Sequence, residues 1–233
     1  EVVARMDIEK LKQQFDWIDI YSELGNKLIQ YQNKRGKLIN IIEDMHSEEL
    51  LAIRLKDLDS SGECKLEDID PFTFFSNFNR DLKIENRIGI LKFLKDKLNL
   101  IEPLPTNFPG IPTLSNQNSW FFGYKKERNV DDISSLWELF IKVKNNENIE
   151  ESFNRCLNIK NVYYNLTMGL FWVSPLNYLP LDRNTRAFLK NNFSYSDNEL
   201  DIKRVKFSGY SSILNTVKNK TKNKPFPEIS LMA

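Results

Sequence analysis

The chain has 233 residues, of which 41% are hydrophobic and 28% charged, a balance typical of soluble globular proteins. It contains no run of about 18 apolar residues, so we expect no membrane span and a cytoplasmic location. The two cysteines, Cys64 and Cys156, exclude a disulfide framework and favour a reducing compartment.

Histidine and glycine usage exclude further classes of protein. His46 is the only histidine, so a metal site built from several histidines is excluded, and we expect His46 near the end of a helix at the surface. Neither of the known glycine-rich phosphate loops occurs in the sequence. We therefore expect no metal, no cofactor and no catalytic activity of the chain's own.

Residues 17–45 carry apolar side chains at steps of three, four or seven, which predicts one amphipathic helix of about eight turns. A short second helix is expected over residues 48–56. Residues 57–68 form a polar stretch with part of a calcium-loop pattern, in which Asp57, Asp59 and Gly62 fit. Asp68 stands where that loop needs glutamate, so a turn with local hydrogen bonds is the simpler interpretation.

The middle of the chain alternates aromatic and helical patterns. Residues 71–80 form a compact aromatic segment, residues 84–98 predict an amphipathic helix, and four prolines mark an irregular connection over residues 103–112. Residues 120–124 are aromatic and fit either a strand or a buried turn. Asn129 is expected to cap the next helix, and a short helix is expected over residues 150–157.

Residues 163–173 are apolar enough to be fully buried, and Pro175 is expected to end that element. Asp182 is placed to cap a helix over residues 183–190. These patterns predict a mainly α-helical module over residues 7–193, with minor irregular or short β segments.

Residues 194–233 differ in composition from the rest of the chain. Seven basic and no acidic residues lie between Lys203 and Lys224, and the last four lysines alternate with polar residues. Without apolar side chains to anchor that run, we expect residues 194–233 to be a basic, loosely packed and mobile connector.

Several motifs in one order resemble a known family. They are Asp70-Pro-Phe-Thr-Phe-Phe75, Phe78-Asn-Arg80, Glu85-Asn-Arg87, Gly110-Ile-Pro112, residues 116–124, Leu136-Trp-Glu-Leu-Phe140, residues 165–172 and Leu181-Asp182. From about Trp17 to Ala233 the chain is similar to the region that precedes the motor domain in McrB-type subunits of modification-dependent restriction systems. Residues 226–233 resemble the family's entry into a GTP-hydrolysing ring domain.

The resemblance implies a function and two partners. Such modules recognise double-stranded DNA, often at a modified base, while the ring domain hydrolyses GTP and recruits a separate nuclease subunit. The chain would then be a non-catalytic target-recognition module. Two alternatives remain open: a protein–protein interaction module of the same defence system, which the net charge of +1 favours, and a helical DNA glycosylase-like enzyme that uses Asp182.

DNA binding needs cations along the phosphates and groups that read bases or stack on them. Residues 116–128 supply both kinds, and three arginines elsewhere are further candidates. The predicted DNA-binding residues are Asn116, Asn118, Trp120, Tyr124, Lys125, Lys126, Arg128, Arg80, Arg183 and Arg186. For each a structural role is the alternative: Trp120 as core, the two lysines as a solvated turn, Arg80 as a helix cap, and Arg183 and Arg186 as partners of acidic residues.

Overall fold

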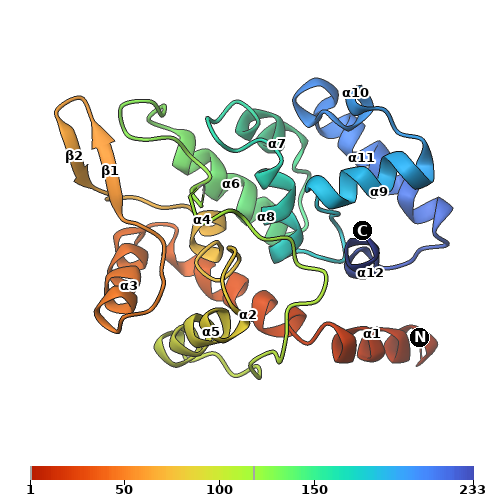
Figure 1. Cartoon of the computed structure of the whole chain (residues 1–233), viewed down its shortest axis with the longest axis horizontal. Helices are drawn as coiled ribbons and strands as arrows, with labels where there is room; N and C mark the ends of the chain where they lie inside the picture. The colour runs from red at the N-terminus through yellow and green to blue at the C-terminus, as the bar shows by residue number, and fades with distance from the viewer. Residues whose placement is uncertain (1, 118) are drawn as a thin grey trace.

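Helices form most of the structure, and one two-stranded hairpin projects from the body (Figure 1). The computed structural model describes residues 2–117 and 119–233, with side chains from residue 7 onward. In chain order the elements are α1 (Val2–Gln14), α2 (Ile18–Leu28), the 3-10 turn η1 (Ile29–Tyr31), α3 (Gly36–Ser47), β1 (Lys56–Asp59), β2 (Gly62–Lys65), α4 (Pro71–Phe75), α5 (Ile84–Leu98), α6 (Asp132–Lys144), α7 (Glu150–Cys156), α8 (Asn165–Val173), α9 (Arg183–Phe193), α10 (Asp197–Leu200), α11 (Ile202–Lys220) and α12 (Phe226–Met232). The predicted mainly α-helical fold is confirmed.

Helix α8 lies at the centre of the core, packed against α2, α4 and α6. Its residues from 166 onward are buried, as the sequence predicts. Gly169 lets two aromatic rings approach the helix, because a Cβ there would lie 2.8 Å from Cδ1 of Phe72 and 2.9 Å from Cε2 of Phe121. These two rings stack on each other with centroids 5.7 Å apart.

Residues 17–45 do not form one helix, contrary to the prediction. The helical pattern breaks after η1, at the four consecutive polar residues 32–35, which have no apolar side chain to bury. The Nε of Arg35 donates to the carbonyl oxygen of Gln32 at 2.9 Å and stabilises the turn. The chain then begins α3 at Gly36, and His46 lies exposed in the last turn of that helix, as expected.

The predicted helix over residues 48–56 is also wrong. Glu49 has a φ of 59° and follows the end of α3, and residues 51–55 have no helical hydrogen bonding. Tertiary hydrogen bonds compete with the helix here, since the amide of Ile53 donates to Oδ1 of Asn77 at 3.0 Å. The polar stretch after it is the β1–β2 hairpin, in which Asp57 pairs with Cys64 and Gly62 has a φ of 123°.

Of the two helix caps predicted from the sequence, the one at Asp182 is confirmed and the one at Asn129 is wrong. Asp70 accepts hydrogen bonds from the amides of Phe72 and Thr73 and caps α4. Asp182 caps α9 in the same way. Asn129 does not cap α6; its own amide donates to the carboxylate of Asp132 at 2.9 Å, so the acid inside the first turn is the acceptor.

Residues 194–233 are not a mobile connector. They form α10, α11 and α12, which bury their apolar side chains in a core that runs from Leu11 to Ile229. Tyr210 is fully buried and its hydroxyl donates to the carbonyl oxygen of Leu179 at 2.6 Å. The sequence expectation followed charge, whereas α11 buries apolar side chains on both sides of a kink at Lys206: Ile202 before it, and Tyr210, Ile213, Leu214 and Val217 after it.

The last helix is held against the proline-rich connection. Oγ of Ser230 donates to the carbonyl oxygen of Gly110 at 2.6 Å. Gly110 has a φ of 75°, and a Cβ there would lie 2.8 Å from the carbonyl oxygen of Pro227, so this close approach needs glycine. Within the described residues, no helix combines the length and the apolar character that crossing a bilayer requires.

Candidate nucleic-acid interface

Residues 116–128, which carry most of the predicted DNA-binding side chains, pack against the hairpin and the strand-like segment before it. The indole nitrogen of Trp120 donates to the carbonyl oxygen of Arg54 at 3.1 Å. Further along, the amide of Lys125 donates to Oδ1 of Asp57 at 2.8 Å, and the amide of Lys126 donates to the carbonyl oxygen of Leu58 at 2.9 Å. The hairpin is therefore joined to residues 125–126 by one main-chain hydrogen bond and by one hydrogen bond from a main-chain amide to the Asp57 carboxylate.

A first concave site, which we call the aromatic hollow, opens where these segments meet. It has a volume of about 570 Å³ and is lined by Arg54, Lys56, Asn116, Gln117, Ser119, Trp120, Phe122, Tyr124 and Asn161. Trp120 is half-buried, with its ring centroid 5.2 Å from that of Phe122 and 5.9 Å from that of Tyr124. Tyr124 is 41% exposed, so the hollow has an aromatic wall in contact with solvent.

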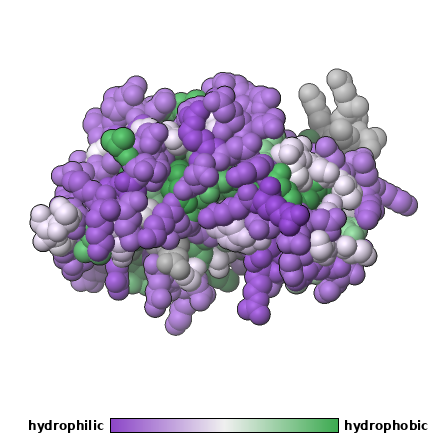
Figure 2. Space-filling view, turned by 90° about the horizontal axis from the view of Figure 1, so that it is seen from above, coloured by the Kyte–Doolittle hydropathy of each residue, from purple (hydrophilic) through white to green (hydrophobic). Residues whose placement is uncertain are grey.

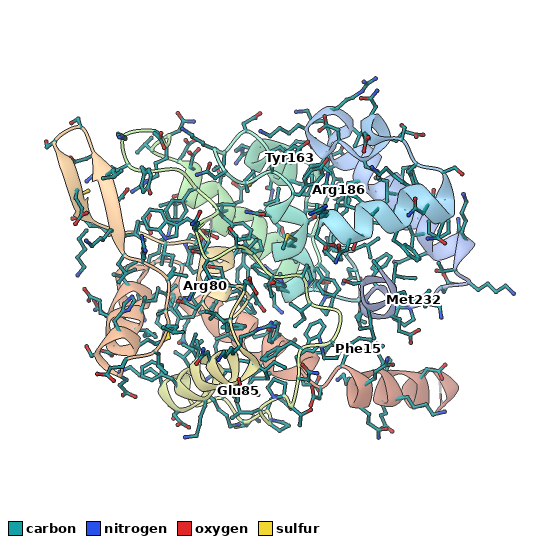
Figure 3. All side chains as sticks on the ribbon, in the orientation of Figure 1. Phe15, Arg80, Glu85, Tyr163, Arg186 and Met232 are labelled. Carbon is teal, nitrogen blue, oxygen red and sulfur yellow. The ribbon has the colours of Figure 1, made fainter. Side chains whose placement is uncertain are left out.

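A second concave site, the arginine hollow, adjoins the first and shares Asn161 with it. Its volume is about 520 Å³, and its lining includes Tyr163, Tyr164, Asp182, Arg183, Asn184 and Arg186. Tyr163 and Arg186 lie close together in Figure 3, where α9 approaches the loop before α8. Because the two hollows share Asn161, they form one continuous surface on which the hairpin, the segment around Trp120 and the start of α9 meet.

The charge of this surface is positive among the described residues. Four cations line the two hollows, namely Arg54, Lys56, Arg183 and Arg186, and Asp182 is the one carboxylate. Lys56 forms an exposed ion pair with Glu63 at 3.1 Å. Asp182 accepts hydrogen bonds from the Oγ1 of Thr185 at 2.6 Å and from the amide of Asn184 at 3.3 Å. An anionic ligand therefore meets cations and amide groups here.

Two of the predicted DNA-binding arginines have structural roles instead. Arg80 is only 6% exposed, its guanidinium donates to the carbonyl oxygen of Leu51, and burial lowers its pKa to about 10. Arg80 is therefore a buried residue that lines neither hollow. Arg128 donates to Oδ2 of Asp57 at 2.8 Å, with side chains that are 12% and 1% exposed. Sequence reasoning missed both because their partners are distant in the chain.

The other predicted residues divide between the hollows and the surrounding surface. Asn116, Trp120 and Tyr124 line the aromatic hollow, and Arg183 and Arg186 line the arginine hollow. Lys125 is exposed and lies 3.8 Å from Glu67, and Lys126 is exposed. Asn118 lies outside the described residues.

The aromatic residues also divide, which the sequence left open. Phe121 and Phe122 are core residues, with exposed fractions of 0% and 1%, while Trp120 and Tyr124 reach solvent. Tyr163 and Tyr164, which helical spacing assigns to the core, are half-buried and line the arginine hollow.

Sequence reasoning missed six of the nine residues that line the aromatic hollow, namely Arg54, Lys56, Gln117, Ser119, Phe122 and Asn161. Asn161 has a φ of 73° and Tyr163 a φ of 26°, so the chain adopts left-handed conformations at the junction of the two hollows. Asparagine tolerates this region better than most residues, and such conformations cluster at functional sites. The asparagine at position 161 was therefore the one local sequence signal that could have indicated this junction.

The geometry of Asp182 allows its capping role to be tested. We expect Asp182→Ala to lower the free energy of unfolding by about 1 kcal/mol, because two acceptor oxygens at the start of α9 are lost. Asp182→Asn should keep most of the stability, since asparagine caps helices about as well as aspartate. Urea denaturation of the three proteins measures the difference. Equal losses in both variants would mean that the charge, rather than the cap, is what stabilises the fold.

These features define a mainly α-helical domain with a cation-lined groove. The chain belongs to the family described as Domain of unknown function (DUF8425), whose family model matches residues 17–233. No curated protein and no solved structure matches the chain significantly.

Proposed function

We propose that this chain is the DNA target-recognition module of a McrB-like restriction subunit and has no catalytic activity of its own. It binds double-stranded DNA, plain or carrying a modified base, in the aromatic hollow. The full-length protein recruits a nuclease subunit through a GTP-hydrolysing domain and acts in the cytoplasm. The resemblance of the ordered motifs to McrB-type subunits supports DNA as the partner.

The observation that carries the proposal is the pairing of solvent-facing aromatic rings with a positive lining. Trp120 and Tyr124 offer flat apolar surfaces for a base, and Asn116 and Gln117 offer amide groups that can form paired hydrogen bonds with base edges. The Nδ2 of Asn116 donates to the carbonyl oxygen of Asp81 at 3.0 Å, which orients that amide. Cations on both sides supply attraction to phosphates.

A protein partner is the second candidate, and a different surface favours it. Figure 2 shows apolar residues along the middle of one face, bordered by hydrophilic ones. On another part of the surface, Ile8 and Leu176 are each more than 40% exposed and line a concave site beside Phe226 of α12. Glycosylase activity gains no such support, because both oxygens of Asp182 accept hydrogen bonds from the start of α9.

Fluorescence anisotropy with labelled duplexes tests the DNA proposal. We expect Tyr124→Ala to weaken binding about 10-fold, since stacking of a base on an aromatic ring contributes about 1–3 kcal/mol. Tyr195→Ala is the matched control, because Tyr195 is a half-buried tyrosine outside both hollows. Modified and unmodified duplexes are compared at low and moderate salt. Absence of binding to any duplex at low salt would refute the proposal.

The tryptophans provide a second readout of the same site. Trp17, Trp137 and Trp172 are fully buried, whereas Trp120 is half-buried in the wall of the aromatic hollow. A bound base should therefore quench the emission of Trp120 selectively. Loss of the DNA-induced quenching in Trp120→Phe, with the protein still folded, would assign the signal to this hollow.

A further inference from the structure

The arginine hollow contains a guanidinium group that is held in place but has no anionic partner. Cζ of Arg186 lies 3.8 Å from the centre of the Tyr164 ring, a cation–π contact that fixes the guanidinium over the ring. Within the part of the chain that the structure describes, its Nε is buried and has no hydrogen-bond partner, a property that it shares with the Nε of Arg80 in the core. Buried donors are nearly always satisfied in folded proteins, so an unsatisfied one beside a cavity points to a missing acceptor.

A second arginine lies on the same face of the same helix. Arg183 and Arg186 are three residues apart on α9 and both line the arginine hollow. In the described part of the chain, neither arginine forms an ion pair with a carboxylate, although thirteen other lysines and arginines do so, such as Lys190 with Asp197 at 2.9 Å. The alternative role considered from the sequence, in which Arg183 and Arg186 pair with acidic residues, is therefore not observed among the described residues.

The tyrosines of this hollow are already covered by cations. Arg186 lies over Tyr164, and Nζ of Lys203 lies 5.1 Å from the centre of the Tyr163 ring. The two tyrosine rings also contact each other, with centroids 4.0 Å apart. Neither tyrosine therefore offers a free ring face to a base, unlike Tyr124 in the aromatic hollow. The arginine hollow is suited instead to binding an anion.

We propose that Arg183 and Arg186 form a phosphoryl-binding subsite, in which Tyr164 positions the Arg186 guanidinium. A guanidinium presents planar, paired donors that match two oxygens of a phosphate, so arginine suits such a site better than lysine. Ser115 and Asn184 line the same hollow, and their hydroxyl and side-chain amide groups are neutral donors. On the proposed function, this subsite holds a phosphate of the strand whose base lies in the aromatic hollow.

The first experiment tests the subsite directly with inorganic phosphate. Because Nε of Arg186 is buried, its proton should exchange slowly and give a resolved arginine signal in ¹H–¹⁵N spectra. We expect a saturable shift of that signal on addition of phosphate, and no comparable shift with chloride at the same ionic strength. The signal is assigned by its loss in Arg186→Lys. An unchanged Arg186 signal in phosphate would overturn the subsite, whatever the outcome with DNA.

The second experiment measures duplex binding as a function of salt. Each phosphate contact that is lost lowers the slope of log affinity against log salt by about 0.9, so Arg183→Gln/Arg186→Gln should lower it by about 2. Lys190→Gln is the matched control, since it removes one charge from the same helix outside the hollow. Arg186→Lys should weaken binding with little change in slope, because the charge stays and the paired donors are lost. Equal effects of the double variant and Lys190→Gln would contradict the proposal.

Binding of three ligands distinguishes the possible sources of the phosphoryl group. They are a DNA closed at both ends, an open duplex with a 5′-phosphate, and a nucleoside monophosphate. Weakening of all DNA binding by the double variant identifies an internal phosphodiester, and weakening confined to the open duplex identifies a terminal phosphate. If only the nucleoside monophosphate and inorganic phosphate depend on the two arginines, the subsite stands while the DNA proposal fails. If DNA binding depends on Tyr124 but not on the two arginines, the DNA proposal stands and the phosphoryl subsite fails.

Discussion

Asp57→Ala should lower the free energy of unfolding by about 3 kcal/mol, the largest effect we expect from a single polar substitution. Removing one partner of a buried ion pair leaves the other charge uncompensated, and Arg128 is only 12% exposed. The matched control is Glu63→Ala in the same hairpin, whose ion pair with Lys56 is exposed and should contribute less than about 1 kcal/mol. Urea denaturation compares the two variants, and similar small losses in both would contradict the structural role of Asp57.

The same carboxylate predicts a pH dependence. Burial raises the pKa of Asp57, but the hydrogen bonds from Arg128 and from the amides of Lys125 and Leu58 lower it by more, so that it lies below its ordinary value. A carboxyl group with a lowered pKa in the folded state stabilises the fold above its unfolded pKa, and this contribution is lost as the pH falls through the folded pKa. The wild-type protein should therefore lose more stability on acidification than Asp57→Ala does.

This substitution should also weaken DNA binding if the proposed function holds. Asp57 accepts a hydrogen bond from the amide of Lys125, and Lys125 directly follows Tyr124 in the wall of the aromatic hollow. Releasing that hydrogen bond lets residues 120–126 move away from the hairpin. Asp57 would then act as a positioning residue. In that case the affinity for DNA should fall in Asp57→Ala, while the slope of log affinity against log salt should stay unchanged because no phosphate contact is removed.

Tyr210→Ala should lower the free energy of unfolding by about 4 kcal/mol, since truncating a fully buried aromatic side chain leaves a large cavity. The ring lies between Phe153 and Tyr178, with centroids 5.5 Å and 6.5 Å away. Tyr210→Phe keeps the packing and should cost about 1 kcal/mol, because only the hydrogen bond to the carbonyl oxygen of Leu179 is lost.

This prediction distinguishes a packed segment from a connector. If residues 194–233 belong to the same core, wild type and Tyr210→Phe unfold in one transition, and removing the segment destabilises the rest. A loss below about 0.5 kcal/mol for Tyr210→Ala would agree instead with a surface substitution in a separate, loosely held segment.

On the proposed function, a groove with separate places for base and phosphate would reconcile DNA binding with the near-neutral charge of the chain. The net charge is +1, yet the two hollows contain four cations and one engaged carboxylate among the described residues. Elsewhere, acidic and basic side chains pair with each other, as Arg155 does with Glu138 and Glu151. Local charge, rather than total charge, determines the attraction that a bound strand feels.

Part of this protein's architecture follows from its sequence by itself. Apolar spacing predicted α5, and Asp182 before helix-forming residues predicted the cap of α9, because these signals act over three or four residues. The clustering of candidates in residues 116–128 likewise pointed to the segment that forms the aromatic hollow.

Only the tertiary structure decided which candidates face solvent. Arg80 and Arg128 look like surface cations in the sequence, but their partners are Leu51 and Asp57, 29 and 71 residues away. The lysine-rich end of the chain was expected to be mobile, yet α11 buries Tyr210 against residues of α7. Hydrogen bonds and packing between distant segments determine burial, and burial decides whether a guanidinium binds a carbonyl in the core or stays available for a phosphate at the surface.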